Sequence, residues 1–583
     1  MKNTFGTENQ MRECPPANHA AVVNMAFGQT APAHSGAWGD APGYGEKMVF
    51  GQNVVRLTLA LIICTLLCSH ASVQAAAAKP QLDGTSRSPN IVFFLVDDMG
   101  LMDTSVPMLM GDEGKPQRHP LNDWYRTPNM ERLAALGTRF SNFYSHSVCS
   151  PTRVSIMTGQ NSARHRTTDY IFPWQNNRLI DTRQYPLAVC QQVPPEWNWA
   201  GLRKNDLTLP KLLKQVGYTT IHVGKGHFAP DEHTGTDPLN LGFDVNVAGS
   251  CIGAPGSYYG QDGFGKRSRG VHARPVPGLG KYHGTDTFLT EALTLEAKSK
   301  VDKALAAERP FFLYMSHYAV HSPFNSDARF AMHYRNSEKN KAAQAYATLI
   351  EGMDKSLGDL MNHFEAKGIA ENTLIIFLGD NGGDAPFPNL DGIASSAPLR
   401  GRKGGKWEGG MRVPFIAAWG KADTNNPWQK KLPIPARSIR QEIGVCYDLL
   451  PTIADFVDAP VPADHPVDGQ NLKRLLTGQA DPTHRDEFLN HYPHPRRGQS
   501  HFFTTWREGS WKMIYEYLKQ GDERYSLYDL SSDPSESNNL ATKNPEKLRS
   551  LMQGMIRELE SREAVYPVRD GQTLEPVIPQ GKK

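Results

Sequence analysis

Residues 90–96 read NIVFFLV, an apolar run that ends at the acidic pair Asp97-Asp98. A strand exposed on one face alternates apolar and polar side chains, whereas a run without alternation is typical of a strand covered on both faces. Such strands belong to parallel sheets that carry helices on both sides. The stretch therefore predicts a central strand of an α/β fold whose carboxyl end presents two carboxylates.

Three further apolar runs end in polar side chains, at 219–223 before Lys225 and His227, 311–315 before His317 and His321, and 373–378 before Asp380-Asn381. Amphipathic helical patterns occur at 128–136, 208–215 and about 341–365, and another strand is expected at 415–419. The predicted fold is α/β, with a large mixed, mainly parallel sheet flanked by helices. Because ligands bind at the carboxyl ends of strands in open parallel sheets, the four ends predict one site.

Two of these ends carry only oxygen ligands, from Asp97, Asp98, Asp380 and Asn381. Carboxylate and amide oxygens suit calcium or magnesium rather than zinc or copper, and calcium is the preferred prediction. Each pair has a structural alternative. Asp97-Asp98 could cap a helix, and residues 380–383, DNGG, could form an ordinary turn.

A reactive cysteine is expected in residues 145–159, SHSVCSPTRVSIMTG. Ser150 is a favourable N-cap, Pro151 suits the first helical position and Gly159 suits the C-cap, which predicts a short helix over 151–158. Cys149 then lies at the positive end of the helix dipole, and Arg153 follows one turn later on the same side. This setting favours an activated nucleophile for a negative substrate; a buried structural cysteine is the alternative.

The segment Cys149-Ser150-Pro151-Thr152-Arg153, followed by Thr158-Gly159, resembles the signature of type I sulfatases, the formylglycine-dependent, arylsulfatase-like enzymes of the alkaline phosphatase superfamily. The resemblance implies an alkaline phosphatase-like fold and oxidation of Cys149 to formylglycine by a formylglycine-generating maturation enzyme. It also implies that the metal ligands, for Ca²⁺ rather than Mg²⁺, are Asp97, Asp98, Cys149, Asp380 and Asn381.

The same resemblance implies a set of catalytic cations and histidines. Segments 224–227, 316–323 and 399–414 match family segments that supply Lys225, His227, His321 and Lys403, with Lys406 as a close competitor of Lys403. In the implied roles, Arg153 and Lys225 orient the nucleophile, Asp380 assists attack, and His227 accepts the proton that triggers sulfate release. His321 and Lys403 hold the sulfate and help the alcohol to leave, while His317 is expected to be structural.

The implied activity is hydrolysis of sulfate monoesters, on a sulfated carbohydrate or an aryl sulfate. Two alternatives remain: a phosphate or phosphonate monoester hydrolase of the same superfamily, and a non-catalytic glycan-binding homologue. Side chains that could shape a sugar pocket lie in expected loops: Tyr170, Trp174, Trp197, Trp199, Tyr258, Tyr259, Arg267 and Arg269.

The N-terminal part, residues 1–78, reads as a disordered extension followed by a signal peptide. Residues 1 to about 50 are rich in Ala, Gly, Pro and Asn, and Met48 is a plausible start. Arg56 precedes the apolar run 57–68, LTLALIICTLLC, and small residues follow. The run is shorter than the roughly 20 residues that a transmembrane helix needs, so we expect export to the periplasm or medium, with cleavage near Ala75. Membrane anchoring by an uncleaved signal, or by a lipid on Cys68, is the alternative.

Charge and cysteine content exclude some classes of protein. The chain has 63 basic and 60 acidic residues, a net charge of +3, which gives no support for nucleic acid binding. Cys190, Cys251 and Cys446 could form one disulfide in an oxidising compartment, but their spacing is not that of a zinc site.

The expected domains are a catalytic domain at 88–480, a C-terminal subdomain at 481–570 and a tail at 571–583. Aromatic-rich strands are expected at 502–506, 511–517 and 525–530, and a final helix at about 545–562. This order predicts a small antiparallel sheet packed by one helix, with a loose tail.

Overall fold

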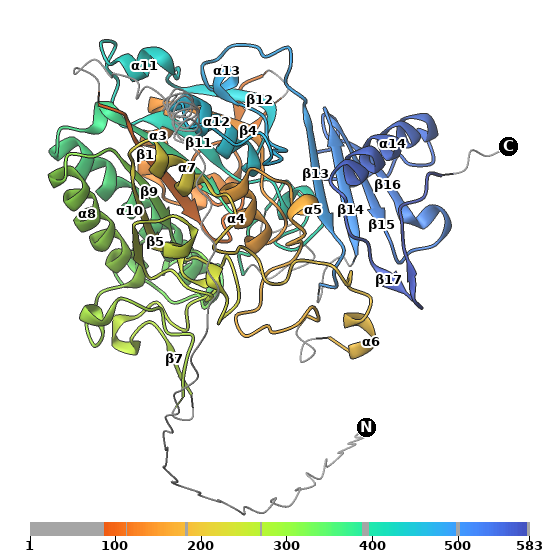
Figure 1. The fold of residues 1–583 in the computed structure, drawn as a ribbon, viewed down its shortest axis with the longest axis horizontal. Coiled ribbons are helices and arrows are strands. Elements are labelled where there is room, and N and C mark those ends of the chain that lie inside the picture. Colours follow the sequence, from red (N-terminus) through yellow and green to blue (C-terminus); the bar gives the residue numbers. More distant parts are fainter. Residues whose placement is uncertain are drawn as a thin grey trace, which may run out of the picture. The chain divides into compact units, whose positions relative to one another are not determined.

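The computed structural model describes residues 87–111, 114–180, 185–268, 271–386, 396–496 and 502–579, with only the backbone at 266–268 and 271–273. The chain divides into two units, Met1–Gln81 and Leu82–Lys583, and all the described residues lie in the second (Figure 1). The predicted signal peptide lies outside the described residues. Within the described ranges, none of the helices combines the length and the apolar character needed to cross a membrane.

An eight-stranded sheet forms the centre of this unit. All neighbouring strands are parallel except that β11 runs antiparallel to both β10 and β4. This confirms the predicted α/β fold with a mixed, mainly parallel sheet. The strands, in spatial order, are β12 (Ser438–Val445), β4 (Thr138–Tyr144), β11 (Phe415–Trp419), β10 (Thr373–Gly379), β1 (Asn90–Val96), β9 (Phe311–Ser316), β5 (Thr219–Gly224) and β6 (Val245–Val247).

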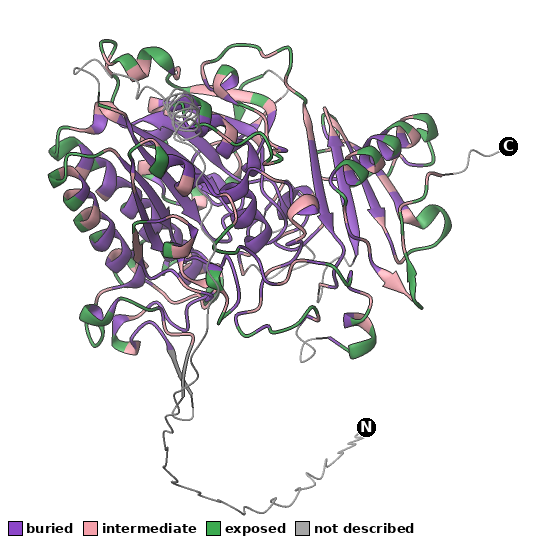
Figure 2. Ribbon diagram, in the orientation of Figure 1, coloured by how far each residue is buried: buried purple, intermediate pink, exposed green. Residues whose placement is uncertain are grey.

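Strand β1 is buried along its whole length, as its sequence predicts (Figure 2). Val92, Phe94 and Val96 join the core beneath α3 (Pro128–Leu136), α8 (Leu289–Ala306) and α10 (Lys341–Ala366). The alternate residues of β1 face a second core under α4 (Cys149–Thr158), α7 (Leu209–Gln215) and α12 (Leu449–Phe456). Helices on both faces leave the strand ends as the place where polar groups gather.

The sequence patterns did not predict β4, β6 or β12. In β4, TRFSNFY, two partly exposed polar residues, Arg139 and Asn142, interrupt the apolar run. Strand β12, SIRQEIGV, lies at the sheet edge and carries charged side chains. Edge strands tolerate polar residues because one side meets solvent, so their sequences lack the signal of a central strand.

The C-terminal sheet is antiparallel and is covered by one helix, as predicted. Its consecutive strands are β13 (Glu487–Tyr492), β14 (Phe503–Glu508), β15 (Trp511–Glu516) and β16 (Tyr525–Asp529), and α14 (Pro545–Ser561) packs on them. Part of the tail expected to be loose, residues 571–583, instead forms β18 (Gln572–Thr573), which pairs with β17 (Val568–Arg569) just before it. The hydroxyl of Tyr525 also donates to the Val577 carbonyl at 2.7 Å.

A group of buried charges lies between the large sheet and the C-terminal sheet. Lys512 Nζ on β15 lies 3.0 Å from Glu408 Oε1 and 2.7 Å from Glu536 Oε1, and the backbone N–H of Glu408 donates to Glu536 Oε2 at 2.7 Å. These contacts fix the loop over 399–414 to the C-terminal sheet. We call this group the Glu408 cluster: Glu408, Lys512, Glu536, Arg412, Arg507 and Tyr144.

Candidate functional site

Helix α4 begins at Cys149, and Val148 rather than Ser150 is its N-cap. The predicted N-cap is therefore wrong. The Ser150 hydroxyl instead accepts the N–H of Ile171 at 3.0 Å and donates to the His227 carbonyl at 3.3 Å, which holds two loops against the helix start. Gly159 ends the helix with φ 70°, as predicted. Cys149 thus lies in the first turn, where the helix dipole is positive.

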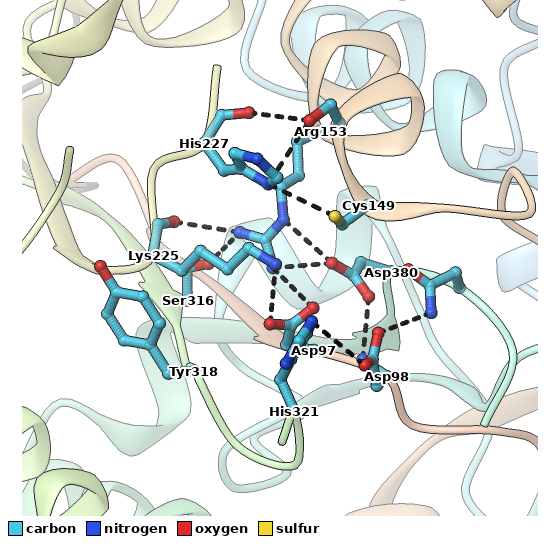
Figure 3. Close-up of polar contacts among 12 residues, drawn as sticks. Asp97, Asp98, Cys149, Arg153, Lys225, His227, Ser316, Tyr318, His321 and Asp380 are labelled. Atoms are coloured by element: carbon cyan, nitrogen blue, oxygen red, sulfur yellow. Dashed lines mark hydrogen bonds and ion pairs between the residues drawn. The ribbon is translucent and has the colours of Figure 1, made fainter. Parts of the chain in front are cut away.

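The four strand ends meet beside Cys149 (Figure 3). Asp97 and Asp380 follow the adjacent strands β1 and β10, whose register pairs Val96 with Gly379. One ligand atom each from Asp97, Cys149 and Asp380 lies within 4.8 Å of the other two, and all three residues are buried. The predicted convergence of these side chains is therefore present.

Two side-chain oxygens at the ends of β1 and β10 lack hydrogen-bond partners. Asp97 Oδ1 and Asn381 Oδ1 are buried and accept no hydrogen bond. Asn381 Nδ2 donates to Asp98 Oδ1 at 2.9 Å, which assigns the other atom of the amide as the open acceptor. Buried polar atoms normally find partners, so open oxygens beside two carboxylates fit a hard divalent cation.

Arg153 joins the helix to three strand ends. Its side chain is fully buried, and its Nε and Nη2 donate to Asp380 Oδ2 at 2.9 and 2.8 Å. Its Nη1 donates to the Lys225 carbonyl at 3.0 Å and to Ser316 Oγ at 2.7 Å. Lys225 Nζ in turn donates to Asp97 Oδ2 at 2.7 Å. Sequence reasoning did not name Ser316 as a site residue, although it directly follows the predicted strand 311–315 and begins the segment 316–323 that resembles the family.

His227 faces the cysteine with one defined nitrogen. Its Nε2 lies 2.6 Å from the Ile171 carbonyl and its Nδ1 lies 3.3 Å from Cys149 Sγ. Because a carbonyl can only accept, Nε2 carries the hydrogen in the neutral ring and the lone pair of Nδ1 points to Cys149. Burial, together with the positive charge of Lys225, holds the pKa of His227 well below its usual value. The ring is therefore a neutral proton acceptor.

Lys403 and Lys406 point to different places. Lys403 Nζ lies 2.5 Å from Asp98 Oδ1, whereas Lys406 Nζ pairs with Glu516 at 2.7 Å, in the C-terminal sheet. Burial opposes the charge of Lys403, but the surrounding acidic groups, Asp98 first among them, together outweigh burial and raise the pKa of the ammonium group. Of the two lysines, Lys403 is the one that the structure brings to the site.

The side chains of His321 and His317 also lie in different places. His321 Nε2 lies 3.6 Å from Asp98 Oδ2, and burial lowers the pKa of His321 to about 3, with Lys403 and Lys225 acting in the same direction. His317 is buried and its Nε2 lies 2.9 Å from Ser356 Oγ on α10, so it belongs to the packing behind the site.

A cavity of about 300 Å³ opens over these groups. Its described lining includes Cys149, His227, His321 and Lys403. Arg274 and Arg496 also line it and were not predicted, because each comes from a loop distant in sequence from the motif segments. The remaining lining residues are Tyr170, Ile171, Phe172, Pro173, Trp174, Gly253 and Ala254.

Two of the eight predicted sugar-pocket residues, Tyr170 and Trp174, line this cavity. Four aromatic residues of the prediction do not line it: Trp197 and Tyr258 are buried in hydrophobic cores, and Trp199 and Tyr259 are partly buried against these cores. The side chains of Arg267 and Arg269 lie outside the described residues. Cys190, Cys251 and Cys446 are buried and form no disulfide in the described part of the chain.

Comparison with known proteins gives matches along most of the chain. The family described as Sulfatase matches residues 89–459, and that described as N-sulphoglucosamine sulphohydrolase, C-terminal, matches residues 407–564. The N-acetylgalactosamine-6-sulfatase of Mus musculus is 30% identical over 410 residues, 68% of each chain. The N-acetylgalactosamine-6-O-sulfatase of Bacteroides thetaiotaomicron is 27% identical over 85% of this chain and 98% of that protein.

Solved structures share the fold. The crystal structure of Ps i-CgsB in complex with k-i-k-neocarrahexaose has a TM-score of 0.59 and 24% sequence identity, and the match covers 81% of this chain and 93% of that one. The likeness therefore extends over both the large sheet and the C-terminal sheet.

Proposed function

This chain belongs to the sulfatase family, and from that premise we propose that it is an exported enzyme that removes sulfate from a sulfated carbohydrate. It would use formylglycine made from Cys149 together with a bound calcium ion. The observation that carries the proposal is the buried group of Asp97, Cys149 and Asp380, whose ligand atoms lie within 4.8 Å of one another beside the cavity.

A carbohydrate substrate is supported by the relatives and by the cavity wall. The mouse and Bacteroides proteins are both named as sulfatases of N-acetylgalactosamine. Tyr170, Phe172 and Trp174 line the cavity, and Trp174 is 55% exposed. An exposed aromatic ring beside a polar site offers an apolar surface for the C–H face of a sugar ring.

The metal would be held by Asp97, Asp98, Asp380 and Asn381, with Cys149 completing the set after its conversion. These residues fit calcium because they supply carboxylate and amide oxygens, two of which accept no hydrogen bond from the protein. When bound, a calcium ion would neutralise sulfate charge and stabilise the charge that develops in the transition state.

Formylglycine at position 149 would supply an aldehyde whose hydrate can attack sulfur and later expel sulfate without a second displacement. His227 is placed to accept the proton, because its Nδ1 lone pair faces position 149 at 3.3 Å from Sγ. Asp380 would assist the attacking hydroxyl, and Arg153 and Lys225 hold the carboxylates around it in place.

Lys403 and His321 line the same cavity on the side of Asp98 and would hold the sulfate. A charged lysine beside the ester stabilises the additional negative charge on the oxygens during transfer. His321 would help the alcohol to leave. The roles of the five cationic or imidazole groups are therefore divided between orienting the nucleophile, accepting its proton and binding the substrate.

Export is supported by the sequence of residues 56–78, in which a basic residue, a short apolar run and small residues follow in order. We expect cleavage near Ala75 and a periplasmic or secreted enzyme. N-terminal sequencing of protein made with its leader would identify the cleavage position, and a mature chain that begins at Met48 would contradict it.

The decisive experiment is the mass of the tryptic peptide 140–153, from protein made with a formylglycine-generating enzyme. Loss of sulfur and gain of an aldehyde at Cys149 are expected, followed by sulfate release from N-acetylgalactosamine 6-sulfate. Activity on 4-nitrophenyl sulfate should exceed that on 4-nitrophenyl phosphate. An intact Cys149 thiol, while a control substrate of the maturation enzyme is converted, would contradict the proposed nucleophile.

A further inference from the structure

We propose that the cavity recognises a second anionic group of the substrate, a carboxylate or a second sulfate, through Arg274 and Arg496. The inference rests on the proposed function and adds the chemical class of its substrate: a carbohydrate that carries another negative charge near the sulfate to be removed.

The cations next to the reacting group are already paired with carboxylates of the site. Arg153 and Lys225 are fully buried and are paired with Asp380 and Asp97, and neither lines the cavity. Lys403 lines the cavity and lies 2.5 Å from Asp98. The two arginines are separate from this set and come from different parts of the chain.

Arg496 reaches the cavity from the C-terminal subdomain, four residues after β13. Its guanidinium carbon lies 5.6 Å from the centre of the Tyr170 ring. It also packs against Gly404, where a Cβ atom would lie 2.3 Å from Arg496 Nε. Arg496 is therefore held between one wall of the cavity and the residue that follows Lys403.

Asp169 precedes Tyr170 in the chain; burial disfavours the charge of Arg496, but Asp169 and other nearby acidic groups together outweigh burial and raise the pKa of Arg496. Its Oδ1 accepts the hydroxyl of Tyr492 at 2.7 Å and the N–H of Tyr170 at 2.8 Å. Asp169 does not line the cavity. The charge of Arg496 is thus stabilised while its side chain forms part of the cavity surface.

Arg274 follows the hairpin of β7 (Lys266–Ser268) and β8 (Val271–Ala273). Its carbonyl accepts the N–H of Gly256 at 2.9 Å, which attaches it to the segment that supplies Gly253 and Ala254 to the wall. It approaches the cavity from a loop other than those of Arg496 and Lys403.

The charge balance of the cavity favours a substrate with more than one anion. Among the described residues that line it, none has a carboxylate, and two, Arg274 and Arg496, are permanent cations that lie beside Lys403, which is paired with Asp98. A cavity lined by one sign of charge concentrates ligands of the opposite sign. Guanidinium groups form paired hydrogen bonds with the oxygens of carboxylates and similar oxyanions, so both arginines suit a second anionic group on the sugar.

The test compares kcat/KM for three sugars on the formylglycine-containing enzyme. They are N-acetylgalactosamine 6-sulfate, its 4,6-disulfate, and the 6-sulfate linked to a glucuronic acid, with the methyl ester of that acid as an uncharged match. We expect the preferred dianionic sugar to exceed the monosulfated one by about tenfold or more, through KM. A preference for the disulfate would identify a second sulfate as the recognised group, and a preference for the glucuronate would identify a carboxylate.

In Arg274→Met and Arg496→Met, the ratio of kcat/KM for the dianionic sugar to kcat/KM for the monosulfated sugar should fall toward one. Arg557→Met, on the exposed face of α14, should keep the wild-type ratio. A wild-type ratio near one for both dianionic sugars, or a ratio unchanged in both cavity variants, would overturn the inference. Calorimetric binding of the same sugars to Cys149→Ala gives the comparison without turnover. Failure to release sulfate from any sugar or from 4-nitrophenyl sulfate would instead contradict the proposed function.

Discussion

The carboxylates at the end of the large sheet and those of the Glu408 cluster are equally buried but differently paired. In the Glu408 cluster, Glu408 Oε1 lies 3.0 Å and Glu536 Oε1 2.7 Å from Lys512 Nζ. Glu408 Oε2 accepts the Tyr144 hydroxyl at 2.5 Å, and Glu536 Oε2 accepts a backbone N–H. At the site, Asp97 Oδ1 and Asn381 Oδ1 accept no hydrogen bond, and Asp97 Oδ1 lies 3.9 Å from Arg153 Nη2. Carboxylate oxygens that each lie within 3.0 Å of a cation or a donor hold the fold together, whereas oxygens without such a close partner can bind a cation.

Calcium removal should have the largest effect on activity, and it should act at the site rather than at the Glu408 cluster. Extraction with a chelator is expected to lower sulfate release by roughly 10⁴-fold, because the open oxygens lose the ion that neutralises the substrate. Added CaCl₂ should restore activity better than MgCl₂. The measurement is initial rate together with metal content. A metal-free protein that keeps its rate of sulfate release would show that these oxygens do not hold a metal ion needed for activity.

Glu408→Gln should act on stability instead. It leaves Lys512, Arg412 and Arg507 buried with less negative charge, so we expect a loss of about 3–5 kcal/mol in the free energy of unfolding. Denaturant titration measures it. Glu516→Gln, which breaks the more exposed pair with Lys406, is the control and should cost less than about 1 kcal/mol. An unchanged unfolding midpoint with lost turnover would place Glu408 in the site.

Lys403→Met and Lys406→Met form a matched pair three residues apart. Lys403→Met should lower kcat/KM by about 100-fold, since it removes a charge that faces the substrate. Lys406→Met should stay within about threefold of the wild type, because Lys406 pairs with Glu516 outside the cavity. Both are measured with 4-nitrophenyl sulfate. Reversed effects would mean that the loop places the other lysine at the sulfate.

The smallest effect concerns pH. Burial, reinforced by the charge of Glu408, raises the pKa of Glu536 to about 7 even though Lys512 opposes the shift. A carboxyl whose pKa is raised on folding stabilises the fold below its unfolded pKa and loses that contribution as pH rises through the folded pKa. Between about pH 4.5 and 7 the wild type should therefore lose about 2 kcal/mol that Glu536→Gln does not lose. The measurement is the free energy of unfolding of both proteins as a function of pH, and parallel curves for the wild type and Glu536→Gln would contradict this prediction.

The sequence allowed prediction of features that depend on local pattern. The buried runs of β1, β5, β9 and β10 predicted both the sheet and the polar groups at its edge, because side-chain periodicity and strand ends are local properties. The position of Cys149 at a helix start followed from Pro151 and Gly159 in the same way, although the cap itself was misplaced by two residues.

Features that depend on long-range packing could not be predicted. The Glu408 cluster joins residues more than a hundred positions apart, and Arg496 meets Tyr170 across 326 positions of the chain. The same limit explains Trp197 and Tyr258: aromatic residues in loops line a cavity or fill a core according to what packs against them.

The burial of Cys149 has a consequence for the order of events in biosynthesis. The side chain is 2% exposed, lies in the first turn of a buried helix and lines a cavity of about 300 Å³. A space of that size admits a sugar but not the active site of another protein. Any maturation enzyme must therefore handle residues 145–159 as an extended peptide. If Cys149 is converted to formylglycine as proposed, conversion and folding would compete for the same newly made chain, and a molecule that folds first would keep its thiol.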